Sequence, residues 1–262
     1  MRRLNLRKIL LLACFAIMLL PISVSAAVKN GIKVNQWTGK GGNYYYLDEN
    51  GKYKKGVHKI KNKLYFFDSN GVQRTGWRKK GSAYYYFNIG KKADGYRVSK
   101  CTVNGIKIAA DGKAQLTNER ARRKVAVMVQ INEWVDKITS PWKTRDQKLK
   151  QCFDYLRKNI PYRYVSGFRG KTDTNWDLWG AEYVLKNRKS DCHPFASTFA
   201  YMANALGYKD IKVCSLVWHS FTYVDGKYYD VSLARHNKTS YYYFGMKSYY
   251  KNQIRYTRNI NT

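Results

Sequence analysis

Two hydrophobic patterns divide this 262-residue chain. Over residues 30–116, short aromatic runs recur about every 20 residues, and polar turn sequences with glycine follow them. Such runs predict β-hairpins, and a hairpin that cannot bury its own aromatic face is expected to stack on its neighbour. We therefore predict an all-β hairpin-repeat solenoid, whose aromatic runs are Tyr44–Leu47, Leu64–Phe67 and Tyr84–Phe87.

From Thr117 onward the apolar residues follow a helical period, so we place a domain boundary near residue 117. A first stripe of apolar residues predicts a helix that ends before Pro141. The pair Thr144 and Gln147 has the spacing of a capping box and predicts a second helix, whose buried side includes Cys152. The first stripe consists of Val125, Met128, Ile131, Val135 and Ile138.

A later amphipathic run has a cysteine at its start. Ser190 or Asp191 is a suitable cap, Cys192 falls in the first turn, and Gly207 ends the run. The free amides and the dipole of a helix start stabilise a thiolate, which favours Cys192 as a nucleophile. A buried, inert cysteine is the alternative at this position.

Asp225-Gly226 is the strongest hairpin signal in the chain. This turn pairs Val224 with Lys227, and the same register places His219 and Asp230 on one face as diagonal neighbours. An aspartate there can orient an imidazole whose other nitrogen faces a thiol. We therefore predict Cys192, His219 and Asp230 as a catalytic set.

Several neighbouring residues are weaker candidates. His193 and His236 are rivals to His219, and Asp230 could be an ordinary polar residue at a strand end. The backbone amide of Cys192 is the first choice as an oxyanion donor, whereas Trp176 and Trp179 could donate or belong to the core.

The residues at the start of the chain indicate where the protein is located. Basic residues precede an apolar run from Ile9 to Leu20 and small residues near Ala26, a pattern typical of a secretory signal peptide over residues 1–26. A retained membrane anchor is the alternative. Signal removal takes away four basic and no acidic residues and lowers the formal charge from +32 to +28. Such a basic exported protein is expected to adhere to wall phosphate polymers or anionic headgroups, and no nucleic-acid motif is present.

The cysteine spacing fits neither a disulfide framework nor a zinc site, so we expect no metal and no cofactor; a disulfide between two of the scattered cysteines is the alternative to a reactive thiol. Four cysteines remain after signal removal: Cys101, Cys152, Cys192 and Cys214.

The segment around Cys192, with His219 near Phe221 and Asp225–Asp230, resembles the transglutaminase-like superfamily in residue types and order. The resemblance covers roughly residues 120–235. It implies an α+β, papain-like fold with helices packed on an antiparallel sheet over residues 118–262. It also implies that Cys192, His219 and Asp230 are the triad.

The hairpin region resembles the cell-wall-binding repeats of Gram-positive surface proteins, which include choline-binding modules. The resemblance implies aromatic cages that can hold a quaternary ammonium. Wall carbohydrate, teichoic polymer and a simple spacer role are also open, as are aromatics that only join the repeats. The candidate ligand-binding residues are Trp37, Tyr45, Tyr65, Trp77 and Tyr85.

Together these features predict a secreted, wall-associated cysteine enzyme that transfers acyl groups from peptide or glutamine-type amides. Hydrolysis and transamidation share the thioester step and are not separated by the sequence. An inert adhesin is the alternative from another class, and a papain-type wall endopeptidase is a third interpretation. The expected partners are a wall polymer at the repeats and a peptide or protein substrate, with no stable membrane span after signal cleavage.

Overall fold

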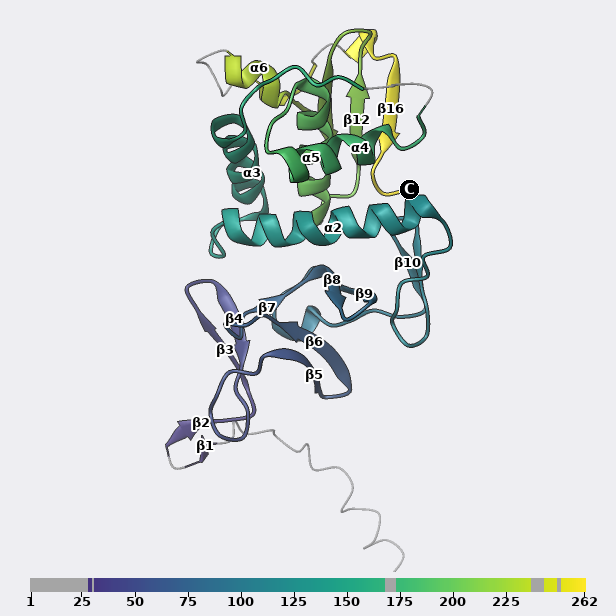
Figure 1. Ribbon diagram of the computed structural model, residues 1–262. Coiled ribbons are helices and arrows are strands. Elements are labelled where there is room, and N and C mark those ends of the chain that lie inside the picture. Colours follow the sequence, from purple (N-terminus) through teal and green to yellow (C-terminus); the bar gives the residue numbers. More distant parts are fainter. Residues whose placement is uncertain (1–27, 30, 168–172, 237–242, 249–250) are drawn as a thin grey trace, which may run out of the picture.

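The computed structural model describes residues 28–29, 31–167, 173–236, 243–248 and 251–262. The described residues form an array of β-hairpins followed by a helical part with an antiparallel sheet, and helix α2 (Glu119–Ile138) lies between the two (Figure 1). The predicted signal peptide, residues 1–26, lies outside the described residues. Within the described part, no helix combines the length and apolar character that crossing a membrane requires.

The array is built from antiparallel hairpins, which pair β1 with β2, β3 with β4, β5 with β6, β8 with β9 and β10 with β11. A short strand, β7, adds to β6. The strands are β1 (Val28–Lys29), β2 (Ile32–Lys33), β3 (Trp37–Lys40), β4 (Asn43–Tyr46), β5 (Gly56–Ile60), β6 (Lys63–Phe67), β7 (Gln73–Arg74), β8 (Gly76–Lys80), β9 (Ala83–Phe87), β10 (Cys101–Val103) and β11 (Ile106–Ile108).

The longer hairpins pair each aromatic strand with the strand before it. The expected turns with glycine after the aromatic runs are also present, and the chain pairs across them: β6 pairs with β7 around Gly71, and isolated antiparallel bridges span the turns at Gly51 and Gly112. Asp68 shows why they form: its carboxylate accepts hydrogen bonds from the amides of Asn70 and Val72, at 2.9 and 3.0 Å, while Gly71 adopts φ +78°. The turns inside the hairpins use other positions with positive φ, such as Asn62 at +64°.

Aromatic side chains join successive hairpins, as expected for a stacked array. The ring of Trp37 on β3 lies 5.1 Å from that of Tyr65 on β6, edge to face. Phe66 on β6 lies 5.8 Å from Phe87 on β9. Each hairpin therefore covers part of the apolar face of the next.

The first two helices after the array follow the predicted pattern. The side chain of Asn118 caps the first of them, and Thr144 and Gln147 form both hydrogen bonds of the predicted capping box. Cys152 is buried in the core, as expected. The helices are α2 (Glu119–Ile138), α3 (Arg145–Asn159), α4 (Trp176–Asn187), α5 (Cys192–Ala205) and α6 (Val231–His236), with short 3-10 turns at η1 (Lys92–Asp94) and η3 (Lys251–Gln253).

The sheet is antiparallel, with strand order β15-β14-β13-β12-β16. The Asp225-Gly226 turn sets the predicted register, because Val224 pairs with Lys227 and Thr222 with Tyr229. Helix α5 packs on this sheet, and the Thr222 hydroxyl donates to the Ala196 carbonyl at 2.8 Å. The strands are β12 (Ile211–Ser215), β13 (Ser220–Val224), β14 (Lys227–Tyr229), β15 (Phe244–Met246) and β16 (Tyr256–Asn259).

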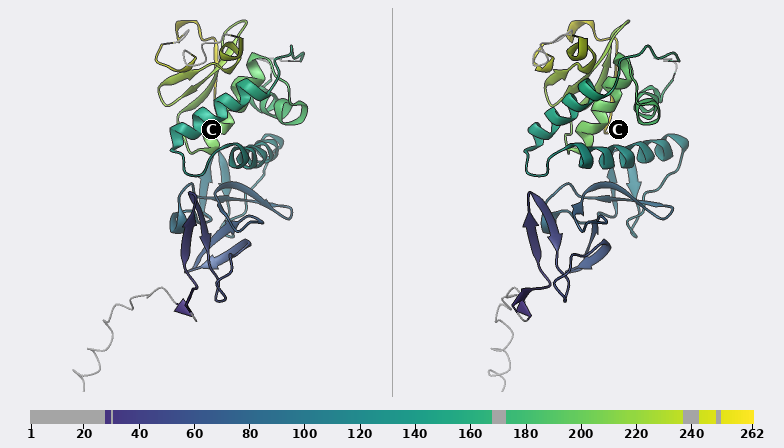
Figure 2. Two further views of the ribbon diagram at one scale, coloured as in Figure 1. Left: turned by 90° about the vertical axis from the view of Figure 1, so that its left-hand side faces the viewer. Right: turned by 60° about the vertical axis from the view of Figure 1, so that its left-hand side comes forward.

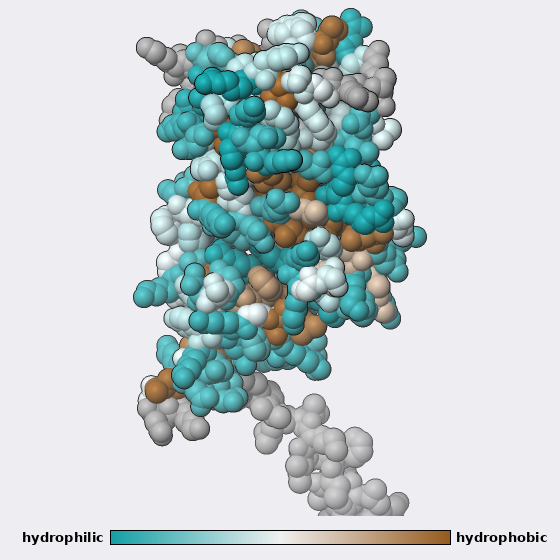
Figure 3. Space-filling model, viewed as in Figure 1, coloured by the Kyte–Doolittle hydropathy of each residue, from teal (hydrophilic) through white to brown (hydrophobic). Residues whose placement is uncertain are grey.

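A continuous core connects the array to the helices. Trp77 of β8 is fully buried in the same apolar cluster as Met128 and Ile131 of α2. The right-hand view of Figure 2 shows α2 lying across the hairpins, and in Figure 3 apolar residues are visible on the surface in the region of this helix. The array is therefore packed against the helical part.

Polar contacts reinforce this junction. The buried Arg78 of β8 pairs with Asp136 of α2 at 2.8 Å. Gly76 has φ +78°, and a Cβ added there would overlap Oδ1 of Asn132. The close approach of β8 to α2 thus depends on glycine at this position.

Candidate active site

Cys192 is the first residue of α5. The Asp191 side chain caps the helix by accepting from the His193 amide at 3.2 Å, and its other oxygen accepts from the Val165 amide at 3.0 Å. Burial raises the pKa of Asp191 against the effect of these hydrogen bonds. The Cys192 amide is one of the first-turn donors that a helix leaves without an internal partner. Helix α5 therefore presents both a thiol and a free amide at one end.

His219 and Asp230 meet beside Cys192. His219 directly precedes β13, and Asp230 directly follows β14, so the hairpin brings both side chains to the same end of the sheet. Nε2 of His219 lies 2.5 Å from Oδ2 of Asp230. The Cys192 side chain also hydrogen-bonds to His219. Since Asp230 occupies Nε2, Nδ1 is the ring nitrogen left for the thiol.

The site favours a protonated imidazole. Burial of His219 opposes its charge, but hydrogen bonds to Asp230 and Cys192 and the charges of both groups outweigh burial and raise the pKa to about 9. At neutral pH the structure thus favours an imidazolium between a sulfur and a carboxylate.

Asp230 is fully buried and held on several sides. Its Oδ1 accepts from the Leu233 amide at 2.9 Å and from the Ser232 hydroxyl at 3.1 Å, which ties it to the start of α6. Its own amide donates to the Tyr243 carbonyl at 2.9 Å. These contacts leave Oδ2 directed at His219.

The rival histidines have other surroundings. His193 is buried, and its Nε2 lies 2.9 Å from the Trp176 carbonyl, within hydrogen-bond distance. Burial lowers the pKa of His193 to about 4. His236 lies at the end of α6, with Nδ1 2.8 Å from the Ser232 carbonyl.

The other described cysteines differ from Cys192 in their surroundings. Cys152 and Cys214 are buried, and burial raises the pKa of Cys214 to about 12. Cys101 is exposed on β10, away from any helix start. Within the described ranges, no group of histidine, cysteine and acidic residues could hold a metal ion.

Tyr162 is a site residue that sequence reasoning missed. It bridges to Ser190 as an isolated parallel β-pair, which places it beside the start of α5. Burial raises the pKa of Tyr162, and the charges of Cys192, Asp191 and Asp230 raise it further. No spacing in the sequence signals this long-range bridge, so only the fold reveals a neutral phenol near the thiol.

The two tryptophans considered as oxyanion donors lie around His193. Trp176 is almost fully buried, with its ring 5.1 Å from that of His193, and Trp179 stacks on the same imidazole at 6.0 Å. Trp218, by contrast, is 66% exposed and stacks on His219 at 5.5 Å. An apolar surface therefore adjoins the candidate nucleophile on the His219 side.

Two of the aromatic residues predicted to bind a ligand are unavailable to one in this structure. Trp77 is fully buried and donates from Nε1 to Asn104 at 3.0 Å, and Tyr65 is buried and donates to the Ala93 carbonyl at 3.0 Å. Their prediction as cage residues is corrected, because the array uses them as internal packing. A ligand-binding cage would need aromatic rings whose faces are exposed to solvent.

The other three aromatic candidates are partly exposed. Trp37 contacts Tyr46, Tyr65 and Phe67. Tyr45 stacks on Tyr53 at 4.3 Å, and the Arg97 guanidinium lies 5.7 Å from the Tyr85 ring. The face of Tyr85 is therefore covered by a cation of the chain itself, in a cation–π contact.

Comparisons with known protein families give one match in the hairpin array and one in the helical part. The sequence profile of the transglutaminase-like superfamily matches residues 132–230, and the profile of a choline-binding repeat matches residues 54–92. No curated protein sequence matches this chain.

Solved structures match part of this chain at low similarity. The choline-binding domain of a Streptococcus pneumoniae protein is 20% identical, with a TM-score of 0.28, over 32% of this chain and 95% of that chain. CbpJ from Streptococcus pneumoniae is 28% identical, with a TM-score of 0.23, over 33% of this chain and 36% of CbpJ. The Cpl-1 endolysin, complexed with a peptidoglycan analogue, is 18% identical, with a TM-score of 0.25, over 36% of this chain and 31% of the endolysin. The chain thus spans about a third of the latter two.

The profile matches fall on the two structural parts described above. Residues 54–92 lie within the hairpins, and residues 132–230 run from α2 to Asp230. The chain therefore carries a choline-binding repeat in its hairpin array and, over residues 132–230, a domain of the transglutaminase-like superfamily.

Proposed function

We propose that this protein is a secreted, wall-associated cysteine enzyme that transfers acyl groups from peptide or glutamine-type amides. The observation that carries the proposal is the position of His219 between Cys192 and Asp230, at the partly exposed start of α5. A transglutaminase-like profile over the same residues supports it.

The first half-reaction begins with Cys192 and the protonated His219. The Cys192 thiolate attacks the amide carbonyl carbon and forms a C–S bond, and the carbonyl oxygen becomes an oxyanion. The Cys192 amide can donate to that oxyanion, and the neutral Tyr162 hydroxyl is a second donor from a neighbouring segment. His219 then gives its proton to the leaving nitrogen as the C–N bond breaks, which leaves a thioester and a free amine or ammonia.

The second half-reaction breaks the C–S bond of the thioester and releases the acyl group from Cys192. Neutral His219 accepts a proton from water or from an amine that attacks the same carbon, and the thiolate leaves with its electron pair. Asp230 holds the imidazole in place throughout and stabilises its charge. Attack by water gives hydrolysis, and attack by an amine gives a new amide.

A labelling experiment tests the thiol. The purified protein is treated briefly with iodoacetamide near neutral pH, and adducts are mapped by mass spectrometry. Cys192 is expected to react faster than the exposed Cys101, and His219→Ala should abolish this preference. Equal slow labelling of Cys192 and Cys101 would favour an inert surface-binding protein.

A product assay separates the two enzyme outcomes. A glutamine-containing protein is incubated with a fluorescent primary amine, and incorporation, ammonia release and chain cleavage are measured together. Incorporation that requires Cys192 indicates transamidation, whereas ammonia or new termini without incorporation indicate hydrolysis. Cys101→Ala is the matched control and should retain full activity.

We also propose that the hairpin array binds a Gram-positive wall polymer. The choline-binding repeat profile and the formal net charge, +32 for the full chain and +28 without residues 1–26, support this. Binding of the Cys192→Ala protein to isolated walls is measured with free choline and with added salt. Competition by choline indicates an aromatic cage, and loss in moderate salt alone indicates charge.

A further inference from the structure

A cationic groove lies where the hairpin array meets the helices. One cavity of about 220 Å³ opens between the β3–β4 turn, the end of β7 and the C-terminal end of α2. A second cavity of about 340 Å³ shares Thr75, Lys91, Asp136 and Lys148 with it and continues toward α3. Neither cavity includes any of the candidate catalytic residues, so the groove is a separate feature.

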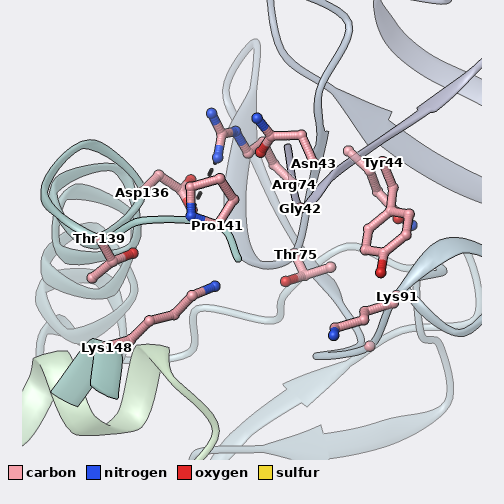
Figure 4. A pocket seen from close by; sticks show the side chains of 12 residues that line it. Gly42, Asn43, Tyr44, Arg74, Thr75, Lys91, Asp136, Thr139, Pro141 and Lys148 are labelled. Carbon is pink, nitrogen blue, oxygen red and sulfur yellow. Dashed lines mark ion pairs between the residues drawn. The ribbon is translucent and has the colours of Figure 1, made fainter. Parts of the chain in front are cut away.

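Two ammonium groups enter the first cavity from opposite sides. Lys148 reaches in from α3 and Lys91 from the array, with Thr75 between them (Figure 4). Among the described residues, neither lysine forms an ion pair with a carboxylate, and the Thr75 hydroxyl has no hydrogen-bond partner. The cavity thus presents three donors that protein acceptors leave unused.

The one carboxylate in the groove is already neutralised. Asp136 pairs with Arg78 at 2.8 Å and lies 3.6 Å from Arg74, which also pairs with Asp68. Lys148 therefore has no carboxylate of its own among the described residues. Its burial lowers its pKa, Asp136 opposes this, and the positive charges of Lys91 and Arg74 lower it further.

The walls of the groove are fixed before any ligand arrives. Gly42 in the β3–β4 turn has φ +78°, and a Cβ there would lie 2.5 Å from the Trp142 amide nitrogen, so the turn packs closely on the loop after α2. The junction through Gly76 and Asn132 holds the other wall. A preformed site of converging cations binds an anion without the cost of assembling them.

We propose that this groove is a binding site for a phosphate group. Donors that converge from opposite walls suit a tetrahedral anion with several acceptor oxygens better than a planar carboxylate, which favours a fork of donors on one side. The adjoining cavity extends the site, with Lys143 and Arg145 along it, and gives room for the next unit of a phosphodiester chain. Free inorganic phosphate and a phosphodiester polymer share the required chemistry.

The test uses calorimetric titration of the purified protein with inorganic phosphate and, separately, with a glycerol phosphodiester oligomer. Replacing Lys91 and Lys148 by glutamine should weaken binding at least tenfold. The control replaces Lys80 and Lys107, exposed lysines of the array outside the groove, and should change binding less than twofold. Tighter binding of the oligomer identifies the polymer as the source, and equal binding identifies free phosphate.

A protection experiment needs no variant. Lysine acetylation of the unaltered protein is followed by mass spectrometry with and without each phosphate compound. Lys148 and Lys91 should be protected several-fold more than Lys80 and Lys107. Equal protection of all four lysines, equal loss of binding in both variant pairs, or no binding to the unaltered protein would overturn the proposal. None of these measurements depends on Cys192 chemistry.

Discussion

Nε2 of His219 lies 2.5 Å from Oδ2 of Asp230, although one residue precedes a strand and the other follows its partner strand. Their contact depends on the Asp225-Gly226 turn, which fixes the register between β13 and β14. A slip of one residue would turn one of the two side chains to the opposite face.

Asp230→Asn should uncouple this pair while the fold is retained, because asparagine can still accept from the Leu233 amide. The pKa of His219 is expected to fall from about 9 toward 6.5, so the imidazole becomes mostly neutral at pH 7.5. The alkylation rate of Cys192 at that pH should drop by roughly tenfold or more. Histidine NMR titration and timed labelling measure the two effects. An unchanged titration midpoint would show that Asp230 does not set the charge of His219.

His193→Gln should remove an acid-sensitive contribution to stability. Burial lowers the folded-state pKa of His193 to about 4, below the ordinary value of 6.5. Its contribution is therefore fully present above pH 6.5 and is lost as the pH falls toward 4, up to about 3 kcal/mol in the free energy of unfolding. Urea unfolding at pH 7.5 and pH 4.5 compares the two proteins. If the free energy of unfolding depends on pH equally in both proteins, His193 is not the source of the acid-sensitive contribution.

Tyr162→Phe should lower turnover without affecting the thiol. The phenol is expected to donate to the oxyanion, so its loss reduces kcat roughly tenfold to a hundredfold. The alkylation rate of Cys192 should stay within about twofold of the original rate. Tyr164→Phe is the control, because Tyr164 is 85% exposed. Retained turnover in Tyr162→Phe would leave the Cys192 amide as the donor from this side of the site.

Gly76→Ala should destabilise the junction between the array and α2. Alanine is strained at φ +78°, and its Cβ would overlap Asn132. Gly56→Ala is the matched control, because Gly56 has φ +82° and open space around it. Strain should cost about 1–2 kcal/mol in both variants, and overlap a further ~1–3 kcal/mol in Gly76→Ala alone. Equal free energies of unfolding would show that the contact is not tight.

The periodic parts of the fold were predictable from the sequence. The apolar stripe of α2, the capping box of α3 and the Asp225-Gly226 turn are local signals, and each appears as expected. Helix α6 and strand β16 were missed. The first has only six residues, and the second is half-buried at the sheet edge beside β12, so neither shows a long period.

Site residues divide in the same way. His219 and Asp230 lie on one local hairpin, so their spacing predicts their contact. Tyr162 reaches the site through a bridge to Ser190, a long-range pair that leaves no local pattern. The roles of Trp77 and Tyr65 were also hidden, because the sequence period places aromatics at contact positions without showing which face α2 or the next hairpin covers.

Helix α2 packs against the hairpins on one side and against α5, which begins at the candidate nucleophile Cys192, on the other, so continuous packing connects the array to this residue. If the array holds a polymer, the distance from the attachment point to Cys192 would therefore be constant. Bonds at one set distance from the attachment point would be presented to the thiol, and bonds nearer or farther would be missed. The junction would thus set the distance between the bound polymer and the bond that reacts, whereas a flexible linker would allow a range of distances.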